Sequence, residues 1–143
     1  SADAYFRIEE INIGMMADVG SLQRLPHLLP EGVVRELAYL GTSLTAGRAE
    51  RLGFVNAVLP DAENLLTAAM EMAHAIATKA PLAISGSKAA ITYTRDHTVA
   101  EGLEWAAVMQ GSIWNTADIL GAIQARATKS PARFADLKPY SKP

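Results

Sequence analysis

The fold class is decided by a short stretch near the start of the chain, which reads Tyr5-Phe6-Arg7-Ile8-Glu9-Glu10-Ile11-Asn12-Ile13. Apolar and polar residues alternate over 6–8 and again over 11–13, and the doubled Glu9-Glu10 shifts the phase between them. A period of two with β-branched residues predicts a β-strand. The strand is expected to end at Gly14, and a loop of small residues follows it.

The rest of the sequence is expected to be mostly helical. The apolar periodicity and the turn residues predict a short strand over 54–59, closed by Pro60-Asp61. Asp18 or Ser21 is expected to cap a short helix that ends at Leu25, and Thr45 to cap one that stops at Gly53. Longer helices are predicted over residues 31–40, 61–79, 81–95, 99–115 and 116–127.

Two isolated strands nearly fifty residues apart pose a physical problem. A stable sheet normally needs three or more strands. Unpaired backbone groups along the strand at 6–13 are costly if they are buried. The strand is therefore expected to complete a sheet made by residues outside this chain, and the chain is expected to be a piece of a longer protein.

The composition narrows the class of protein. Half of the 143 residues are apolar and a fifth are charged, which is typical of a globular protein with one core. A net charge of −2 favours neither nucleic acid nor an anionic membrane surface as a partner. The chain has no cysteine and no apolar run of the roughly 20 residues that a bilayer requires. A cytoplasmic protein without a membrane partner is expected.

Two acidic residues are the first candidates for chemistry. Glu10 ends the predicted strand, and Asp18 lies in the loop beside Met15, Met16 and Val19. Burial among apolar groups raises the pKa of a carboxyl group, which makes it useful as an acid or base near neutral pH. Taken alone, the pattern favours a simpler interpretation, in which Glu10 is a solvated edge residue and Asp18 a helix cap.

The other reactive residue types form no recognisable site. The three histidines, His27, His74 and His97, are scattered without the spacing of metal ligands, so no metal site is expected. Ser85 and Ser87 have no nearby His–Asp pattern, which argues against a serine nucleophile.

Two runs of sequence resemble the crotonase superfamily of enoyl-CoA hydratases and isomerases. The first begins with Glu10-Ile11-Asn12-Ile13-Gly14 and continues with Leu22-Gln23-Arg24-Leu25-Pro26. The second covers residues 44–58 and is similar to the family pattern Ala-x-x-Ala-x-x-x-Gly-Leu-Val-x-x-Val, from which Gly47 and Phe54 depart. The helices that begin at Pro81-Leu82-Ala83 and continue through Leu103-Glu104 are similar to those with which family members trimerise.

This resemblance implies an α/β fold, the C-terminal part of a crotonase-type ββα spiral that is mostly helical in this chain. Residues 1–80 would belong to the spiral core, and residues 81–143 to a helical trimerisation region. A homotrimer or a hexamer made of two trimers is the expected assembly.

Asp18 separates two branches of the superfamily. Enoyl-CoA hydratases carry a glycine at this position, whereas the loop at 16–25 is similar to that of the Δ3,5-Δ2,4-dienoyl-CoA isomerases, as is the run Thr94-Arg95-Asp96-His97. The resemblance implies that Glu10 and Asp18 act as an acid/base pair. Two carboxylates on opposite sides of an extended dienolate can serve two carbons that a single carboxylate hardly reaches.

The implied function is isomerisation of an acyl-CoA thioester in fatty-acid β-oxidation. Coenzyme A is part of the substrate, so no separate cofactor is expected, and the resemblance suggests that Phe134 and Lys138 contact it. The thioester oxygen needs two N–H donors, which family members supply from their N-terminal half. A third acidic residue of the isomerases would fall before Ser1. The chain by itself is therefore expected to be inactive.

Two other functions remain open. An enoyl-CoA hydratase or a Δ3-Δ2-enoyl-CoA isomerase keeps the fold and changes the reaction, although Asp18 argues against the hydratase. A catalytically silent assembly module is the third, because the helices from Pro81 onward carry apolar stripes that need partner surface. Those stripes contain Ile84, Ile91, Val99, Leu103, Val108 and Ile113.

Overall fold

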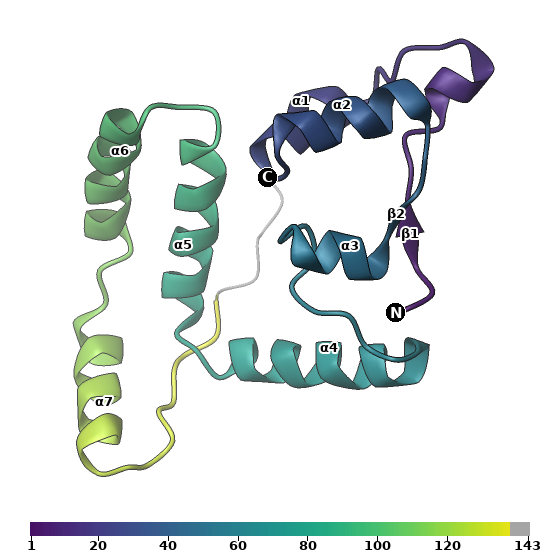
Figure 1. Ribbon diagram of the computed structural model, residues 1–143. Helices are drawn as coiled ribbons and strands as arrows, with labels where there is room; N and C mark the ends of the chain where they lie inside the picture. The colour runs from purple at the N-terminus through teal and green to yellow at the C-terminus, as the bar shows by residue number, and fades with distance from the viewer. Residues whose placement is uncertain (138–143) are drawn as a thin grey trace, which may run out of the picture. The chain divides into compact units, whose positions relative to one another are not determined.

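A computed structural model describes residues 1–137 of the chain (Figure 1). Contacts divide the chain into two compact units, Ser1–Met70 and a second that begins at Glu71. Each unit is described by itself. The predicted division at residue 80 concerns a role in assembly and stays a prediction.

The first unit begins with a strand that is much shorter than predicted. β1 covers only Tyr5–Phe6 and pairs antiparallel with β2, Leu44–Thr45, with Tyr5 opposite Thr45 and Phe6 opposite Leu44. The prediction of a strand over residues 5–13 is therefore wrong beyond Phe6. Residues Glu10–Ile13 instead form the 3-10 helix η1, because the phase shift at Glu9-Glu10 breaks the alternation that a longer strand needs. Gly14, with a φ of 76°, ends this turn in the left-handed region that glycine favours.

The predicted strand over 54–59 is also wrong, since these residues turn back onto the preceding helix. The N–H of Phe54 donates to the carbonyl oxygen of Ala49 at 2.9 Å, and the N–H of Val58 donates to Oε1 of Glu50 at 3.0 Å. The ring of Phe54 packs edge-on against Phe6, with ring centres 4.9 Å apart. The apolar residues of this run thus pack on the core without extending a sheet.

The helices of the first unit agree with prediction, although the caps do not. They are α1 (Ser21–Arg24), η2 (Leu25–His27), α2 (Glu31–Leu40) and α3 (Ala46–Arg51), and α4 (Ala62–Ala77) runs across the division between the units. Gly20 precedes α1 with a φ of 103°, so neither Asp18 nor Ser21 caps it as predicted. Thr45 precedes α3 as predicted, yet its side chain makes no capping hydrogen bond.

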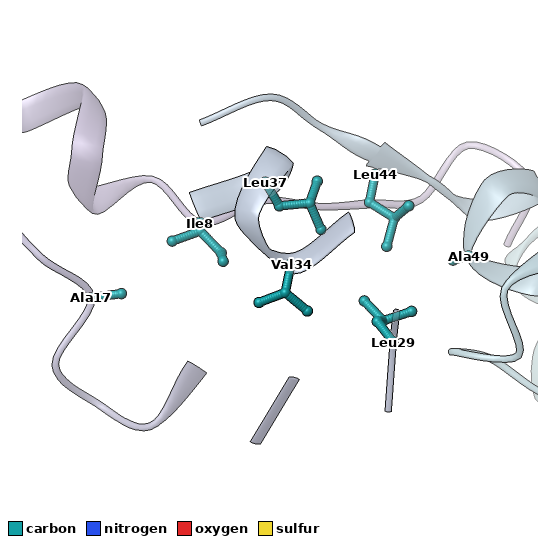
Figure 2. Packing of buried hydrophobic residues seen from close by; sticks show 7 residues of the cluster. All are labelled: Ile8, Ala17, Leu29, Val34, Leu37, Leu44 and Ala49. Atoms are coloured by element: carbon teal, nitrogen blue, oxygen red, sulfur yellow. The ribbon is translucent and has the colours of Figure 1, made fainter. Parts of the chain in front are cut away.

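The core of the first unit gathers around α2 (Figure 2). Val34 and Leu37 of α2 meet Ile8 from the N-terminal segment, Leu29 from the turn before α2, and Leu44 from β2. Leu44 is the most deeply buried large side chain, with 1% of its surface exposed. Burial of these side chains stabilises the unit by roughly 1.5–3 kcal/mol each.

The second unit contains three helices whose bounds follow the predictions closely. They are α5 (Pro81–Thr94), α6 (Val99–Ser112) and α7 (Thr116–Ala127). α5 and α6 pack together as a helical hairpin, and each buries a glycine. A Cβ atom at Gly86 would lie 2.5 Å from Ile113, and one at Gly102 would lie 2.6 Å from Thr94. The two helices therefore approach closely at both positions.

The turn between α5 and α6 is held by a capping box. Thr98 and Glu101 bond reciprocally, since the N–H of Glu101 donates to Oγ1 of Thr98 and the N–H of Thr98 donates to Oε2 of Glu101. Three rings stack beside it, with Tyr93 between His97 and Trp105. Within residues 1–137, no helix is long and apolar enough to span a bilayer.

Candidate functional site

Glu10 is the first residue of η1, and its backbone fixes a tight turn. Its carbonyl oxygen accepts a hydrogen bond from the N–H of Met15 at 2.9 Å. The side chain is half-buried at the start of this turn. The predicted placement at the end of a strand is wrong, but Glu10 still directly follows the segment that packs on the core.

Asp18 lies in an irregular loop between two structured segments. It is exposed, and it follows Ala17, which is buried in the core. Two residues later, Gly20 takes a φ of 103° under the guanidinium group of Arg24. A Cβ atom at residue 20 would lie 2.8 Å from Nη1 of Arg24. The backbone conformation therefore favours glycine at this position, whereas the flexible Arg24 side chain could move aside for a larger residue.

An apolar groove lies in the first unit, and each of the two acidic residues is next in sequence to a residue that lines it. The volume of the groove is about 690 Å³. Glu10 directly precedes the lining residue Ile11, and Asp18 directly follows the lining residue Ala17. The apolar side chains that line it are Ile8, Ile11, Met15, Met16, Ala17, Leu22, Pro26, Val34 and Ala38.

A polar network on α2 forms one border of the groove. Arg35 donates to Oε1 of Glu31 through Nε at 2.8 Å, and to the hydroxyl of Tyr39 through Nη1 at 2.7 Å. The hydrogen bonds to Glu31 and then to Tyr39 raise the pKa of the Arg35 guanidinium. This network was not predicted from the sequence, although the spacing of four residues between its members is a visible signal.

The groove offers a surface suited to a hydrocarbon chain, and the two acidic residues neighbour its lining residues in the sequence. A half-buried and an exposed carboxylate can each accept or donate a proton. In this chain the groove is open, since Met15 and Met16 are 51% and 69% exposed. Asp18 is exposed, so the burial among apolar groups that was expected for it is not observed.

The remaining predicted residues lie elsewhere. Phe134 is half-buried in the second unit, where it lines a small cavity with Leu82, Ile119 and Ala122. Lys138, the other residue expected to contact coenzyme A, lies outside the described residues. Within the described part of the chain, no three His, Asp or Glu side chains are grouped as metal ligands would be.

Several known proteins are similar to this chain in sequence or in fold. A family profile described as enoyl-CoA hydratase/isomerase matches residues 1–138. The Δ3,5-Δ2,4-dienoyl-CoA isomerase of Rattus norvegicus is 38% identical over 132 residues, and that of Homo sapiens is 40% identical over 124 residues. These matches cover 92% and 86% of this chain, but only 40% and 38% of the two isomerases. A carnitinyl-CoA dehydratase of Salmonella arizonae is 34% identical to this chain. The match covers 93% of this chain and 49% of that enzyme.

Solved structures agree on the fold. An enoyl-CoA hydratase from Mycobacterium marinum matches with a TM-score of 0.83 at 34% identity, covering 93% of this chain and 52% of that one. An enoyl-CoA hydratase from Geobacillus kaustophilus matches with a TM-score of 0.85 at 30% identity, covering 94% of this chain and 52% of that one. The chain thus spans about half the length of the solved structures, and its mostly helical segment matches the C-terminal half of the crotonase fold. The chain belongs to the enoyl-CoA hydratase/isomerase family, within the crotonase superfamily.

Proposed function

We propose that this chain carries the proton-transfer part of a dienoyl-CoA isomerase site, with Glu10 and Asp18 as its acid/base pair. The observation that carries the proposal is that Glu10 and Asp18 bracket, in the sequence, a run of residues of which Ile11, Gly14 and 15–17 line the apolar groove. The isomerase relatives from rat and human, at 38% and 40% identity, support this reaction class.

The chemistry assigns a role to each part of the site. One carboxylate removes a proton from an acyl carbon next to the conjugated system, and the other returns a proton to a carbon several bonds away. The apolar lining accommodates the hydrocarbon chain of an acyl-CoA, of which coenzyme A is a part. The negative charge that develops on the thioester oxygen requires N–H donors. Those donors are assigned to the half of the fold that the matched segment does not cover.

A chimera tests the proposal in a complete fold. Residues 1–143 replace the matching segment of the Rattus norvegicus isomerase, and conversion of a 3,5-dienoyl-CoA is followed by the absorbance of the rearranged diene. Glu10→Gln and Asp18→Asn are each expected to lower kcat by about 100-fold or more, as loss of an acid or base does. Glu71→Gln, an exposed change on α4, is the matched control and should leave kcat unchanged.

The kcat values of the two carboxylate variants show whether Glu10 and Asp18 have a catalytic role. Unchanged kcat in both carboxylate variants of an active chimera would leave the pair without a catalytic role. Circular dichroism and gel filtration of each variant distinguish loss of chemistry from loss of fold.

A hydratase is the second candidate, because the two solved enoyl-CoA hydratases described above are 34% and 30% identical to this chain. Hydration of a 2-enoyl-CoA and isomerisation of a 3,5-dienoyl-CoA are measured side by side on the chimera. Isomerisation is expected to be the faster reaction, and Asp18→Gly is expected to reduce it selectively.

Assembly, compartment and the contacts to coenzyme A complete the proposal. A homotrimer or a hexamer fits the exposed apolar side chains of α5 and α6, and a role in β-oxidation fits the isomerase reaction. The cytoplasmic location stays a prediction, because the names of the isomerase relatives place those proteins in mitochondria or in peroxisomes. Contacts from Phe134 and Lys138 to coenzyme A also stay predictions.

A further inference from the structure

The polar side chains that line the groove are gathered on one helix. They belong to Glu31, Arg35 and Tyr39 of α2, and the other lining residues are apolar or glycine. Their spacing of four residues places the three side chains on one side of that helix. A ligand pocket that is mostly apolar uses its few polar groups to set which ligand fits and how it lies. The α2 border is therefore the part of the groove that can distinguish one hydrocarbon chain from another.

The hydrogen bonds among these three side chains leave defined positions for a ligand. Nε and Nη2 of Arg35 both donate to Oε1 of Glu31, at 2.8 Å and 2.6 Å. Nη1 of Arg35 donates to the hydroxyl of Tyr39 at 2.7 Å. Because that oxygen accepts from Arg35, the hydroxyl proton of Tyr39 can be donated to a ligand. Among the described residues, 1–137, Oε2 of Glu31 has no hydrogen-bond donor, so it can accept a hydrogen bond from a ligand.

The charges of the network favour a neutral polar group. The carboxylate of Glu31 balances the guanidinium of Arg35, so the three side chains together carry no net charge. A carboxylate on the ligand can only accept hydrogen bonds, and it would be repelled by Glu31. A hydroxyl group can accept from Tyr39 or donate to Glu31. The side chains of Arg35 and Glu31 are 59% and 69% exposed, so the selectivity is expected to be modest.

We propose that Tyr39 and Glu31 select acyl chains that carry a hydroxyl group on the hydrocarbon tail. Tyr39 donates to the oxygen of that hydroxyl, and Glu31 disfavours a tail that ends in a carboxylate. Arg35 is a positioning residue, since it holds the other two side chains at the border of the groove. The inference rests on the proposed function in one respect, namely that the groove takes the acyl chain. It does not depend on the proton-transfer roles of Glu10 and Asp18.

Titration of the chain with saturated acyl thioesters of N-acetylcysteamine tests the proposal. These esters carry the acyl chain without the nucleotide of coenzyme A, and they have no double bond to isomerise. Isotope-labelled methionine methyl groups locate the binding by NMR, since Met15 and Met16 line the groove whereas Met70 and Met72 lie on α4.

Plain, ω-hydroxy and ω-carboxy esters are compared at each of several medium chain lengths. For at least one length, the ω-hydroxy ester should shift the signals of Met15 and Met16 and bind about fivefold more tightly than the plain ester. The ω-carboxy ester of that length should bind no more tightly than the plain one.

A pair of tyrosine variants tests the donor. Tyr39→Phe removes the hydroxyl and keeps the ring, so the preference for the ω-hydroxy ester should fall below about twofold. Tyr5→Phe removes the same group from a residue of matched exposure, 62% against 64% for Tyr39, and should leave the preference unchanged.

A change of charge tests the part assigned to Glu31. Glu31→Gln leaves the guanidinium of Arg35 unbalanced, so the ω-carboxy ester should bind about threefold more tightly than it does to the native chain. Glu63→Gln, in the first turn of α4, removes a charge from a residue that does not line the groove and should have no such effect. If Glu31 only stabilised α2, its loss would not change the preference between two esters.

The possible results separate this inference from the proposed function. Equal affinities of the plain and ω-hydroxy esters at every length would overturn the inference and leave the groove as the site of the acyl chain. A preference that survives both Tyr39→Phe and Glu31→Gln would also overturn it. Absence of shifts at Met15 and Met16 with every ester would count against the acyl-chain assignment as well. A hydroxyl preference in the chain, together with a folded chimera that does not isomerise a 3,5-dienoyl-CoA, would support the inference and count against the isomerase reaction alone.

Discussion

Leu44 ties the N-terminal segment to α2 and α3. It lies in β2, opposite Phe6, and packs within the core cluster that includes Leu29, Val34 and Leu37. The apolar character of these residues is visible in the sequence. That Leu44 belongs to a strand is not, because Phe6, its partner in the sheet, is close to forty residues away in the chain.

Truncation of Leu44 is expected to destabilise the first unit. Leu44→Ala should lower the free energy of unfolding by about 2–5 kcal/mol, since it removes transfer energy and leaves a cavity. Urea denaturation followed by circular dichroism measures this change. Leu66→Ala on α4, where the leucine is 65% exposed, is the control and should change stability by less than about 0.5 kcal/mol. Equal effects of the two substitutions would contradict the position of the core.

Two glycines of α6 are expected to respond oppositely to substitution by alanine. A Cβ atom at Gly102 would lie 2.6 Å from Oγ1 and 3.3 Å from Cβ of Thr94, a stiff β-branched residue. Gly102→Ala should therefore destabilise the hairpin by about 1–3 kcal/mol. Gly111 has no neighbour within 4 Å of such an atom. Gly111→Ala should stabilise it by up to about 1 kcal/mol through helix propensity. Thermal unfolding of both variants measures these two changes in stability. A stabilising effect of Gly102→Ala would contradict the close packing of α5 and α6.

At the scale of elements, the long helices follow their sequence periodicity, whereas the strands do not. Helix hydrogen bonds are local, so the residues between Pro81 and Ala127 contain most of the information that α5, α6 and α7 need. Strands depend on a partner, and the partner of β1 is only two residues long. The remaining residues of the predicted strand form η1, which satisfies its backbone groups locally.

The capping box of α6 predicts a dependence of stability on pH. Hydrogen bonds from the side chain and then the backbone of Thr98 lower the pKa of the Glu101 carboxyl group below its usual 4.5. A lowered pKa in the folded state means that the carboxylate form favours folding, so this contribution is fully present above about pH 4.5 and is lost as the pH falls through the folded-state pKa.

Unfolding of the chain by urea, measured from pH 7 down to pH 3, tests this prediction. Glu101→Gln keeps a side-chain acceptor for the capping box but cannot titrate. Relative to this variant, the native chain should lose stability as the pH falls. Parallel pH profiles for the two proteins would show that Glu101 does not contribute through its charge.

At the scale of the whole molecule, the exposed apolar side chains of the hairpin predict self-association. Ile91 on α5 and Val99, Leu103 and Val108 on α6 are each at least 68% exposed. Sedimentation of the chain is expected to give a trimer or a hexamer, because burial of such side chains between copies is favourable. Leu103→Glu should shift the mass toward the monomer, whereas Glu104→Gln, at the next position of the same helix, should not. A monomer at every concentration would speak against assembly through this hairpin.

The sequence by itself determined the family, the order and bounds of the main helices, and the two carboxylates to test. These follow from local periodicity, from Pro and Gly punctuation, and from the resemblance carried by residues 10–26 and 44–58. Only the tertiary structure decided that β1 pairs with β2, that Glu10 opens a 3-10 helix, and that the segment between Glu10 and Asp18 lines an apolar groove. The reason is physical: pairing, burial and grooves depend on which distant residues meet, and no local pattern in the chain records those contacts.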